Sequence, residues 1–269
     1  MLVAMASRQV VVFGGGRGIG AAVGSAFATA GDTVTLVART EAQVRETARQ
    51  IGATALVADV GDPQAVARVF ERVPMPDVVV HAAGVQGGPG AVGPLWETDP
   101  LAFAAVVRIN FLGTYHVLRE SLRRMQSGAV ICFSGGGAAF PRPYFAAYGA
   151  TKTGVLRLVE TAQRELREQG REVSVFALAP GAVRTAMTEE VLALGVAAGS
   201  AEAEAARKIT QGEGVPPQLA GELCRFLATP QARPLAGRLV HVKESYREYV
   251  RRGLSEASGC LRRIDYPEG

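Results

Sequence analysis

The sequence predicts a doubly wound α/β fold, in which helices cover both faces of a parallel sheet of about seven strands. Short runs rich in valine and leucine, such as QVVVF at 9–13, lack the polar alternation of a half-exposed strand. Longer stretches with apolar residues at helical spacing separate these runs. A glycine-rich turn joins the first run to the first helical stretch. Buried strands that alternate with helices in this way are typical of the fold class.

The expected elements follow one another in a regular order along the chain. Strands are expected at 9–13, 33–38, 53–60, 77–84, 129–134, 172–180 and 237–242. Helices are expected at 18–30, 41–51, 63–73, 98–126, 146–169 and 217–229. Residues 185–215 are rich in Ala, Gly and Glu and predict short helices. No linker or repeat divides the chain, so we expect a single domain over residues 1–243 and a basic tail at 244–269.

The composition favours a globular domain that binds an anionic small molecule. Hydrophobic residues make up 48% and charged residues 20% of the 269 residues, which suits a globular domain with a large core. The net charge is +4, but the arginines are spread along the chain, which favours an anionic cofactor or substrate over a nucleic acid. No long apolar stretch and no signal-type start is seen, so neither a membrane span nor a signal peptide is expected.

The three cysteines indicate a reducing compartment. Cys132, Cys224 and Cys260 are scattered and show no metal-ligand spacing. Cys132 falls within an expected strand, where a thiol behaves as a small core residue. We therefore expect reduced thiols, a cytoplasmic protein and no metal site.

The first glycine run, VVVFGGGRGIG, predicts a nucleotide-binding turn. Gly14, Gly18 and Gly20 lie between an expected strand and an expected helix. Such a turn brings the backbone close to a diphosphate, and the helix N-terminus offers free N–H groups to the phosphates. The alternative is an ordinary turn, but the strand and helix on either side favour a Rossmann-type dinucleotide site.

The end of the second strand favours NADP(H) over NAD(H). An NAD site usually places Asp or Glu there to hold the ribose 2′-hydroxyl. Here the strand ends in LVART, with Ala38 at the position of the carboxylate and no acid from Thr33 to Thr40. Arg39, and Arg17 in the glycine turn, can pair with a 2′-phosphate.

A second glycine run, at 135–137, precedes a Tyr-x-x-x-Lys sequence whose side chains can exchange protons with a substrate. Tyr148 and Lys152 are four residues apart near the start of an expected helix, so they share one face. A phenol has an ordinary pKa of about 10, and a neighbouring lysine cation together with the positive nicotinamide ring lowers it, which makes proton exchange with a carbonyl or alcohol oxygen feasible. Ser134, at the end of the preceding strand, can hydrogen-bond the same oxygen. The alternative is a plain surface pair on a helix.

Taken in order, these motifs resemble those of short-chain dehydrogenases/reductases over about residues 8–243. The matching positions are the glycine turn at 14–20, Asp59-Val60, Ala82-Ala83-Gly84, Asn110, Ser134, Tyr148, Lys152 and the run Pro180-Gly181-Ala182-Val183-Arg184-Thr185. The resemblance implies that Tyr148 is the general acid, that Lys152 holds the nicotinamide ribose, and that Ser134 polarises the substrate carbonyl. Asn110 would anchor a water in a proton relay.

The resemblance also implies a cofactor site, a substrate lid and an oligomer. NADP(H) would contact Gly14, Gly16, Arg17, Gly18, Ile19, Gly20, Arg39, Asp59, Val60, Ala82, Ala83, Gly84, Asn110, Tyr148, Lys152, Pro180, Gly181, Val183 and Thr185. Residues 185–215 correspond to the lid and, with residues 86–97, are expected to line a largely apolar substrate pocket. A homodimer or homotetramer would form through the helices at 98–126 and 146–169.

Four positions or segments depart from the family pattern. Phe13 replaces the usual threonine before the glycine turn, and His81 stands where the family has Asn. Ser134 lies 14 positions before Tyr148, whereas a spacing of 13 would fall on Gly135. Either the loop carries an extra residue or the serine is offset. The tail beyond 243 lacks the family's glycine pair. In one interpretation Tyr246, Tyr249 and Val250 pack on the body or on another subunit, and LRRID at 261–265 lies across the substrate mouth. In the other, the segment is a partly ordered basic tail.

Two functions from different classes fit this pattern. The first is an NADPH-dependent carbonyl reductase of small or medium substrates, or the reverse alcohol dehydrogenase. The second is a catalytically silent regulator that senses NADP(H) on the same fold. A sugar-nucleotide epimerase or dehydratase needs a further substrate domain, for which the residues after 243 leave no room. Retention of Ser134, Tyr148, Lys152 and Asn110 favours the enzyme.

Overall fold

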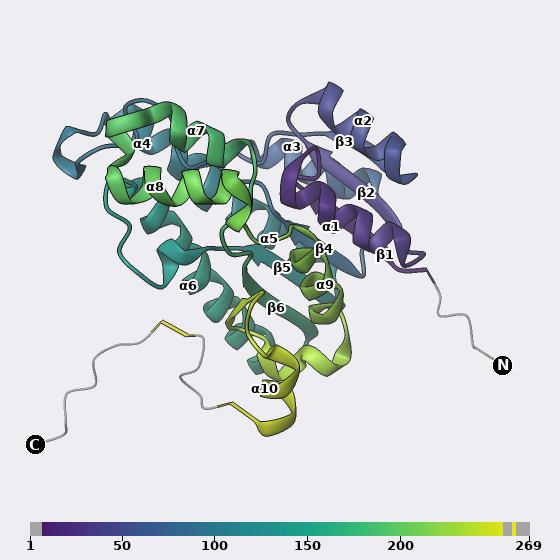
Figure 1. The fold of residues 1–269 in the computed structure, drawn as a ribbon. Helices are drawn as coiled ribbons and strands as arrows, with labels where there is room; N and C mark the ends of the chain where they lie inside the picture. The colour runs from purple at the N-terminus through teal and green to yellow at the C-terminus, as the bar shows by residue number, and fades with distance from the viewer. Residues whose placement is uncertain (1–6, 255–259, 262–269) are drawn as a thin grey trace, which may run out of the picture.

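The computed structural model, which describes residues 7–254, 260 and 261, contains one parallel sheet flanked by helices (Figure 1). Its seven strands are β1 (Gln9–Phe13), β2 (Thr33–Ala38), β3 (Thr54–Val57), β4 (Val78–His81), β5 (Ser127–Phe133), β6 (Glu172–Ala179) and β7 (Leu239–His241). Their order in the sheet is β3-β2-β1-β4-β5-β6-β7, and every pair is parallel. The doubly wound α/β prediction is confirmed.

Helices cover both faces of the sheet because alternate strand residues point to opposite sides. On β1, Val10 and Val12 pack into one core, and Val11 and Phe13 pack into the other. The first core is covered by α1 (Gly18–Thr29), α2 (Glu41–Ile51) and α9 (Gln218–Leu227). The second is covered by α3 (Pro63–Arg72), α5 (Gly113–Arg124) and α6 (Ala146–Glu168). The inner strands are therefore buried on both faces, which explains their continuous apolar sequences, whereas the edge strand β3 is partly exposed.

Local sequence signals set several helix ends. Asp62 and Asp99 cap α3 and α4 (Pro100–Val107), where their carboxylates accept hydrogen bonds from the backbone N–H of Gln64 and Ala102 at 2.9 and 2.7 Å. A proline follows each cap at the first helical position, where no backbone N–H is needed. Gly52 ends α2 in the left-handed conformation, with a φ of 69°.

The helix expected at 98–126 is interrupted at the position of a candidate site residue. A π-helical turn (Arg108–Leu112) separates α4 from α5, and Asn110 lies within it, fully buried. Such turns occur often at functional sites because they redirect one side chain without ending the helix. By length and composition alone, the stretch Pro100–Arg124 could cross a membrane, a test that core helices of soluble proteins also pass.

The lid segment 185–215 folds into short helices as expected. They are α7 (Ala186–Leu194), a 3-10 turn (Gly195–Ala198), α8 (Ser200–Lys208) and a π-helical turn (Ile209–Glu213). In Figure 1 α7 and α8 lie together with α4 at one end of the molecule. Val191, Ala198 and Ala206 form a small apolar cluster with Val92 and Phe145, which anchors the lid to the body. The remaining 3-10 turns are Leu95–Glu97, Gly136–Ala138 and Pro230–Leu235.

The start of the tail packs on the body of the protein. In α10 (Tyr246–Arg252), Tyr246 and Val250 contact the first core, and the Tyr246 ring centroid lies 5.1 Å from that of Phe226. Tyr249, the third residue of the expected stripe, is 36% exposed. The backbone N–H of Leu261 donates to Glu160 of α6 at 2.6 Å, and the rest of LRRID lies outside the described residues.

Gly20 provides a test of how the glycine turn packs. A Cβ atom at this position would lie 2.1 Å from the carbonyl oxygen of Gly14, so Gly20→Ala must displace the turn. We expect the free energy of unfolding to fall by about 1–3 kcal/mol, measured by urea denaturation. Gly88→Ala is the control, because no atom lies within 4 Å of that Cβ position. Equal stability of the two variants would contradict this account of the turn.

Candidate active site

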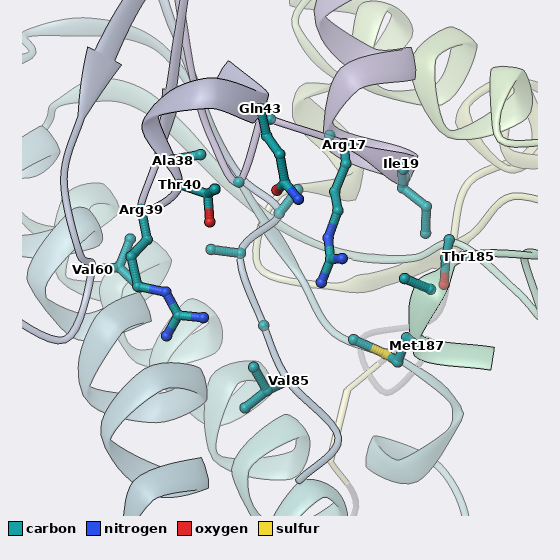
Figure 2. Close-up of a pocket in the computed structure, with 18 of the residues that line it drawn as sticks. Arg17, Ile19, Ala38, Arg39, Thr40, Gln43, Val60, Val85, Thr185 and Met187 are labelled. Atoms are coloured by element: carbon teal, nitrogen blue, oxygen red, sulfur yellow. The ribbon is translucent and has the colours of Figure 1, made fainter. Parts of the chain in front are cut away.

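A cavity of about 600 Å³ lies at the carboxyl ends of the strands, beside the point where the strand order reverses between β1 and β4. The glycine turn, the end of β2 and the turn after β4 form its walls (Figure 2). The expected cofactor residues that line it are Gly14, Gly16, Arg17, Gly18, Ile19, Gly20, Arg39, Asp59, Val60, Ala82, Ala83, Gly84 and Thr185.

Backbone contacts hold the glycine turn against two neighbouring strands. Gly14 has a φ of 82°, and a Cβ atom there would lie 2.5 Å from the backbone nitrogen of Ala83. The backbone N–H of Gly14 donates to the carbonyl of Val37 at 2.8 Å, and that of Ala82 donates to the carbonyl of Phe13 at 2.8 Å. These bonds support the turn without the hydroxyl that Phe13 replaces, and the Phe13 ring instead stacks on Phe70 in the core.

The end of β2 presents positive charge to the cavity. Ala38 stands at the carboxylate position, and the Arg17 and Arg39 side chains both extend into the cavity (Figure 2). Arg17 has a distant ion pair with Glu190 on the lid, at 3.8 Å. Gln43, in the first turn of α2, also lines the cavity and was not predicted. The Arg17 and Arg39 guanidinium groups can pair with an anionic group that enters the cavity.

Tyr148 and Lys152 lie at the neighbouring strand end, on the first turns of α6. Lys152 is buried, and its Nζ donates to the carbonyl of Phe133 at 2.9 Å and lies 5.6 Å from the centre of the Tyr148 ring. Burial lowers the pKa of Lys152 to about 8. Burial also raises the pKa of the half-buried Tyr148 phenol, and the nearby Arg142 cation opposes this rise. The net direction is opposite to the lowering expected from the sequence, because the desolvation of the phenolate is the larger effect.

Asn110 joins the π-helical turn to the segment after β4. Its Oδ1 accepts from the backbone N–H of Val85 at 2.8 Å, and its Nδ2 donates to the carbonyl of Val85 at 2.7 Å. The Cβ position of Gly84 lies 3.3 Å from both Asn110 Oδ1 and Lys152 Nζ. The structure therefore brings Asn110 and Lys152 to the same turn, although neither lines the cofactor cavity itself.

Ser134 occupies a different place from the one expected. Its buried hydroxyl donates to the backbone carbonyl of Lys152 at 2.9 Å and so ties β5 to α6. The residue that faces the phenol is Gly135, whose Cβ position lies 3.1 Å from Tyr148 Oη. The common spacing thus falls on Gly135, which carries no hydroxyl, and the catalytic role of Ser134 stays a prediction.

The segment after β6 contributes less to the cavity than expected. Thr185 lines it, together with Arg184 and Met187, which were not predicted as contacts. Pro180, Gly181 and Val183 do not line it. Val183 is buried in the core.

His81 is a packed core residue. It is 1% exposed, and its ring meets the Phe13 ring edge-on at 6.4 Å between centroids. Neither ring nitrogen has a hydrogen-bond partner among the described residues. Burial and the Lys152 cation lower its pKa to about 3, which keeps the imidazole neutral. This is consistent with a packing role.

The chain matches the sequence profile of the family described as short chain dehydrogenase over residues 8–193. The chain belongs to the short-chain dehydrogenase/reductase family. Members of this family are oxidoreductases that use nicotinamide cofactors.

Several relatives resemble this short-chain dehydrogenase over most of its length. It is 30% identical to 3beta-hydroxysteroid dehydrogenase 1 of Eggerthella lenta, over 87% of this chain and 92% of that protein. It is 32% identical to the short-chain reductase protein NovJ of Streptomyces niveus, over 86% of this chain and 91% of that protein. A crystal structure of an actinorhodin polyketide ketoreductase variant with NADPH has a TM-score of 0.77, with 25% identity over 90% of this chain and 98% of that chain.

Ser134→Ala tests whether the serine is structural. We expect the free energy of unfolding to fall by about 1 kcal/mol, because the Lys152 carbonyl loses its buried donor. Turnover of any carbonyl substrate of the wild-type protein is expected to fall by less than about tenfold, since Gly135 faces the phenol. Ser121→Ala is the matched control, because this buried hydroxyl donates to the carbonyl of Val117 at 2.7 Å on α5. A loss of about a hundredfold or more in turnover for Ser134→Ala alone would show that the hydroxyl acts on the substrate.

Proposed function

We propose that this short-chain dehydrogenase is an NADP(H)-dependent carbonyl reductase, or an alcohol dehydrogenase in the reverse direction, with Tyr148 as its general acid and base. The main support for the proposal is that the Tyr148–Lys152 pair lies close to the residues that line the cavity. The Tyr148–Lys152 pair lies at the end of β5, beside a dinucleotide cavity whose β2 end offers Arg39 and no carboxylate. NADPH in the related ketoreductase structure and the names of the two relatives support the same assignment.

The chemistry requires one hydride and one proton. NADPH, when bound, would supply the hydride that forms a C–H bond at the carbonyl carbon. The O–H bond of Tyr148 breaks, and its proton passes to the carbonyl oxygen, which leaves a phenolate. The Lys152 ammonium, 5.6 Å from the ring, stabilises that phenolate. With a pKa lowered to about 8, Lys152 can then return a proton to the phenolate and regain one from solvent near neutral pH.

The surroundings of Tyr148 favour an apolar carbonyl substrate of small or medium size. Tyr148 packs against a cluster formed by Val92, Phe145, Val191 and Leu192, which come from the body and the lid. Apolar walls with few polar groups select by shape and by burial of hydrocarbon surface. We further propose a cytoplasmic homodimer or homotetramer without nucleic-acid or membrane partners, in keeping with the typical oligomeric state of the family.

A catalytically silent NADP(H)-binding regulator is the second candidate function. Gly135 is the observation that favours it, because the position facing the phenol lacks a hydroxyl. The buried Lys152 beside the Tyr148 ring favours the enzyme, since cofactor binding alone has no need of the acid–base pair that the two residues form. NADPH oxidation with a panel of ketones and aldehydes, assayed with both coenzymes, separates the two. Tight NADPH binding without turnover of any substrate would favour the regulator.

Tyr148→Phe removes only the hydroxyl from the proposed acid. We expect turnover to fall by about a hundredfold to ten-thousandfold, because general acid catalysis is lost, while the Kd for NADPH changes by less than about threefold. Stopped-flow reduction and NADPH fluorescence titration measure the two quantities. Tyr115→Phe, on α5, is the control. Full turnover in Tyr148→Phe would refute the assignment of the acid.

Arg39→Ala removes a proposed contact to the 2′-phosphate. We expect the Kd for NADPH to rise by about tenfold or more, whereas the Kd for NADH stays within about twofold, because NADH has no phosphate there. Arg45→Ala is the matched control, since Arg45 lies on α2, the helix that follows Arg39, and pairs with Glu41 at 2.7 Å outside the cavity. Isothermal titration calorimetry with both coenzymes gives the ratio of the Kd for NADH to the Kd for NADPH in each variant. An unchanged ratio would contradict the role of Arg39.

A further inference from the structure

The site lacks the hydroxyl that the family pattern would place beside Tyr148, at position 135. Gly135, at the position facing Tyr148 Oη, has no side chain, and the Ser134 hydroxyl is engaged by the Lys152 carbonyl. The phenol of Tyr148 must then act without a hydroxyl partner from the end of β5. Under these conditions the electrostatic surroundings of the phenol matter more, because the phenolate that it forms has fewer hydrogen-bond donors.

A second cation lies against the Tyr148 ring. Arg142, in the loop between β5 and α6, places its guanidinium carbon 5.0 Å from the centre of the Tyr148 ring and 4.3 Å from that of Phe145. The side chain of Arg142 is only 19% exposed, so its charge is poorly screened by water. Together with Lys152, whose Nζ lies 5.6 Å from the ring centre, Arg142 surrounds the proposed acid with positive charge.

The lid holds Arg142 in this position. Glu202, in the first turn of α8, accepts two hydrogen bonds from Arg142, one from Nε at 2.8 Å and one from an Nη at 2.7 Å. Two parallel bonds of this kind fix the plane of the guanidinium as well as its place. The Glu202 side chain is 25% exposed, so this pair is more sheltered than an ordinary surface ion pair.

The loop that carries Arg142 is fixed at a second point. Tyr144 has a φ of 68°, the left-handed region that a tyrosine rarely adopts. Its carbonyl accepts from the backbone N–H of Gly93 at 2.9 Å. Its ring lies 2.6 Å from the Cβ position that Gly199 lacks, at the start of α8. Residues 142–144 are thus held between the body and the lid, and the unusual backbone of Tyr144 is part of that docking.

We propose that Arg142 is a positioning residue for the reaction: held by Glu202 of the lid, its guanidinium fixes the ring of Tyr148 and stabilises the phenolate that forms when the phenol gives up its proton. This inference rests on the proposed function, because it assigns Arg142 to the acid–base step of Tyr148. The lid carboxylate has the opposite effect on the phenolate, since Glu202 is negative. A closed lid thereby sets both the position and the strength of the acid.

Replacing Arg142 and replacing Glu202 are expected to change the pKa of Tyr148 in opposite directions. The Arg142 cation lowers the pKa of Tyr148, and the Glu202 carboxylate raises it. Lys152, on α6, is the third charged group that faces the ring. The lid helix α7 and the segment before α4 pack against Tyr148 through apolar side chains, Val191, Leu192, Leu194 and Val92. A purely structural tether would instead give the same direction of change when either partner is replaced.

The test is a direct titration of the Tyr148 phenol in three variants. Protein labelled with 3-fluorotyrosine gives one ¹⁹F signal per tyrosine, and Tyr148→Phe identifies the signal of interest. We expect Arg142→Met to move the titration midpoint upward by roughly half a pH unit or more and Glu202→Gln to move it downward by a similar amount. Arg142→Lys, which keeps the charge, should stay closer to the wild type than Arg142→Met.

A matched control comes from the same helix. Glu204 pairs with Arg207 on the exposed face of α8, so Glu204→Gln removes a lid carboxylate without touching Arg142, and the midpoint should not move. Shifts of both Arg142→Met and Glu202→Gln in the same direction, or no shift in either, would overturn the proposal. The titration needs neither substrate nor coenzyme, so its failure is distinguishable from loss of the proposed function, which Tyr148→Phe turnover tests.

The same variants should change the pH profile of the reaction. Alcohol oxidation needs the phenolate, so the pH of half-maximal kcat is expected to rise in Arg142→Met and to fall in Glu202→Gln. Far-UV circular dichroism checks that each variant is folded. If both profiles keep the wild-type midpoint in a folded protein that turns over substrate, Arg142 does not act on the proton-transfer step and the proposal is wrong.

Discussion

The parallel pairing of β1 with β4 is the constraint on which the site depends. Phe13 pairs with His81 in this register, so the glycine turn after β1 and the segment after β4 leave the sheet side by side. The backbone of Gly14 then approaches that of Ala83 so closely that a Cβ atom would fall 2.5 Å from its nitrogen. Gly14 and Ala83 both line the cavity, so this close contact forms part of its wall.

The reacting groups are positioned by a second set of contacts, between β5 and α6. Lys152 donates to the carbonyl of Phe133, and Ser134 donates to the carbonyl of Lys152. These two bonds join the last residues of the strand to the first turns of the helix. Lys152 is buried there, and this burial lowers its pKa to about 8. Tyr148, one turn earlier on α6, lies beside Gly135.

Electrostatics then distinguish the two ends of the site. At the cofactor end, Arg17 and Arg39 extend into an open cavity, where they are free to meet an anionic group. At the end that holds Tyr148, Lys152 is buried and the Arg142 side chain is 19% exposed, and the Arg142 cation lowers the pKa of the Tyr148 phenol. Two lid carboxylates lie near these cations, Glu190 at 3.8 Å from Arg17 and Glu202 in an ion pair with Arg142.

The amino-acid sequence by itself determined the fold class, the order of the strands and helices along the chain, and the family. Continuous apolar strands, glycine turns and helix caps are local signals, and the Tyr148–Lys152 spacing depends only on helix geometry. The tertiary structure decided what depends on contacts between distant segments. It placed Gly135, not Ser134, against the phenol, raised the pKa of Tyr148 by burial, and paired Arg142 with Glu202 across sixty positions of sequence. No local pattern reports burial or a partner in another element, because both are set by how the elements pack.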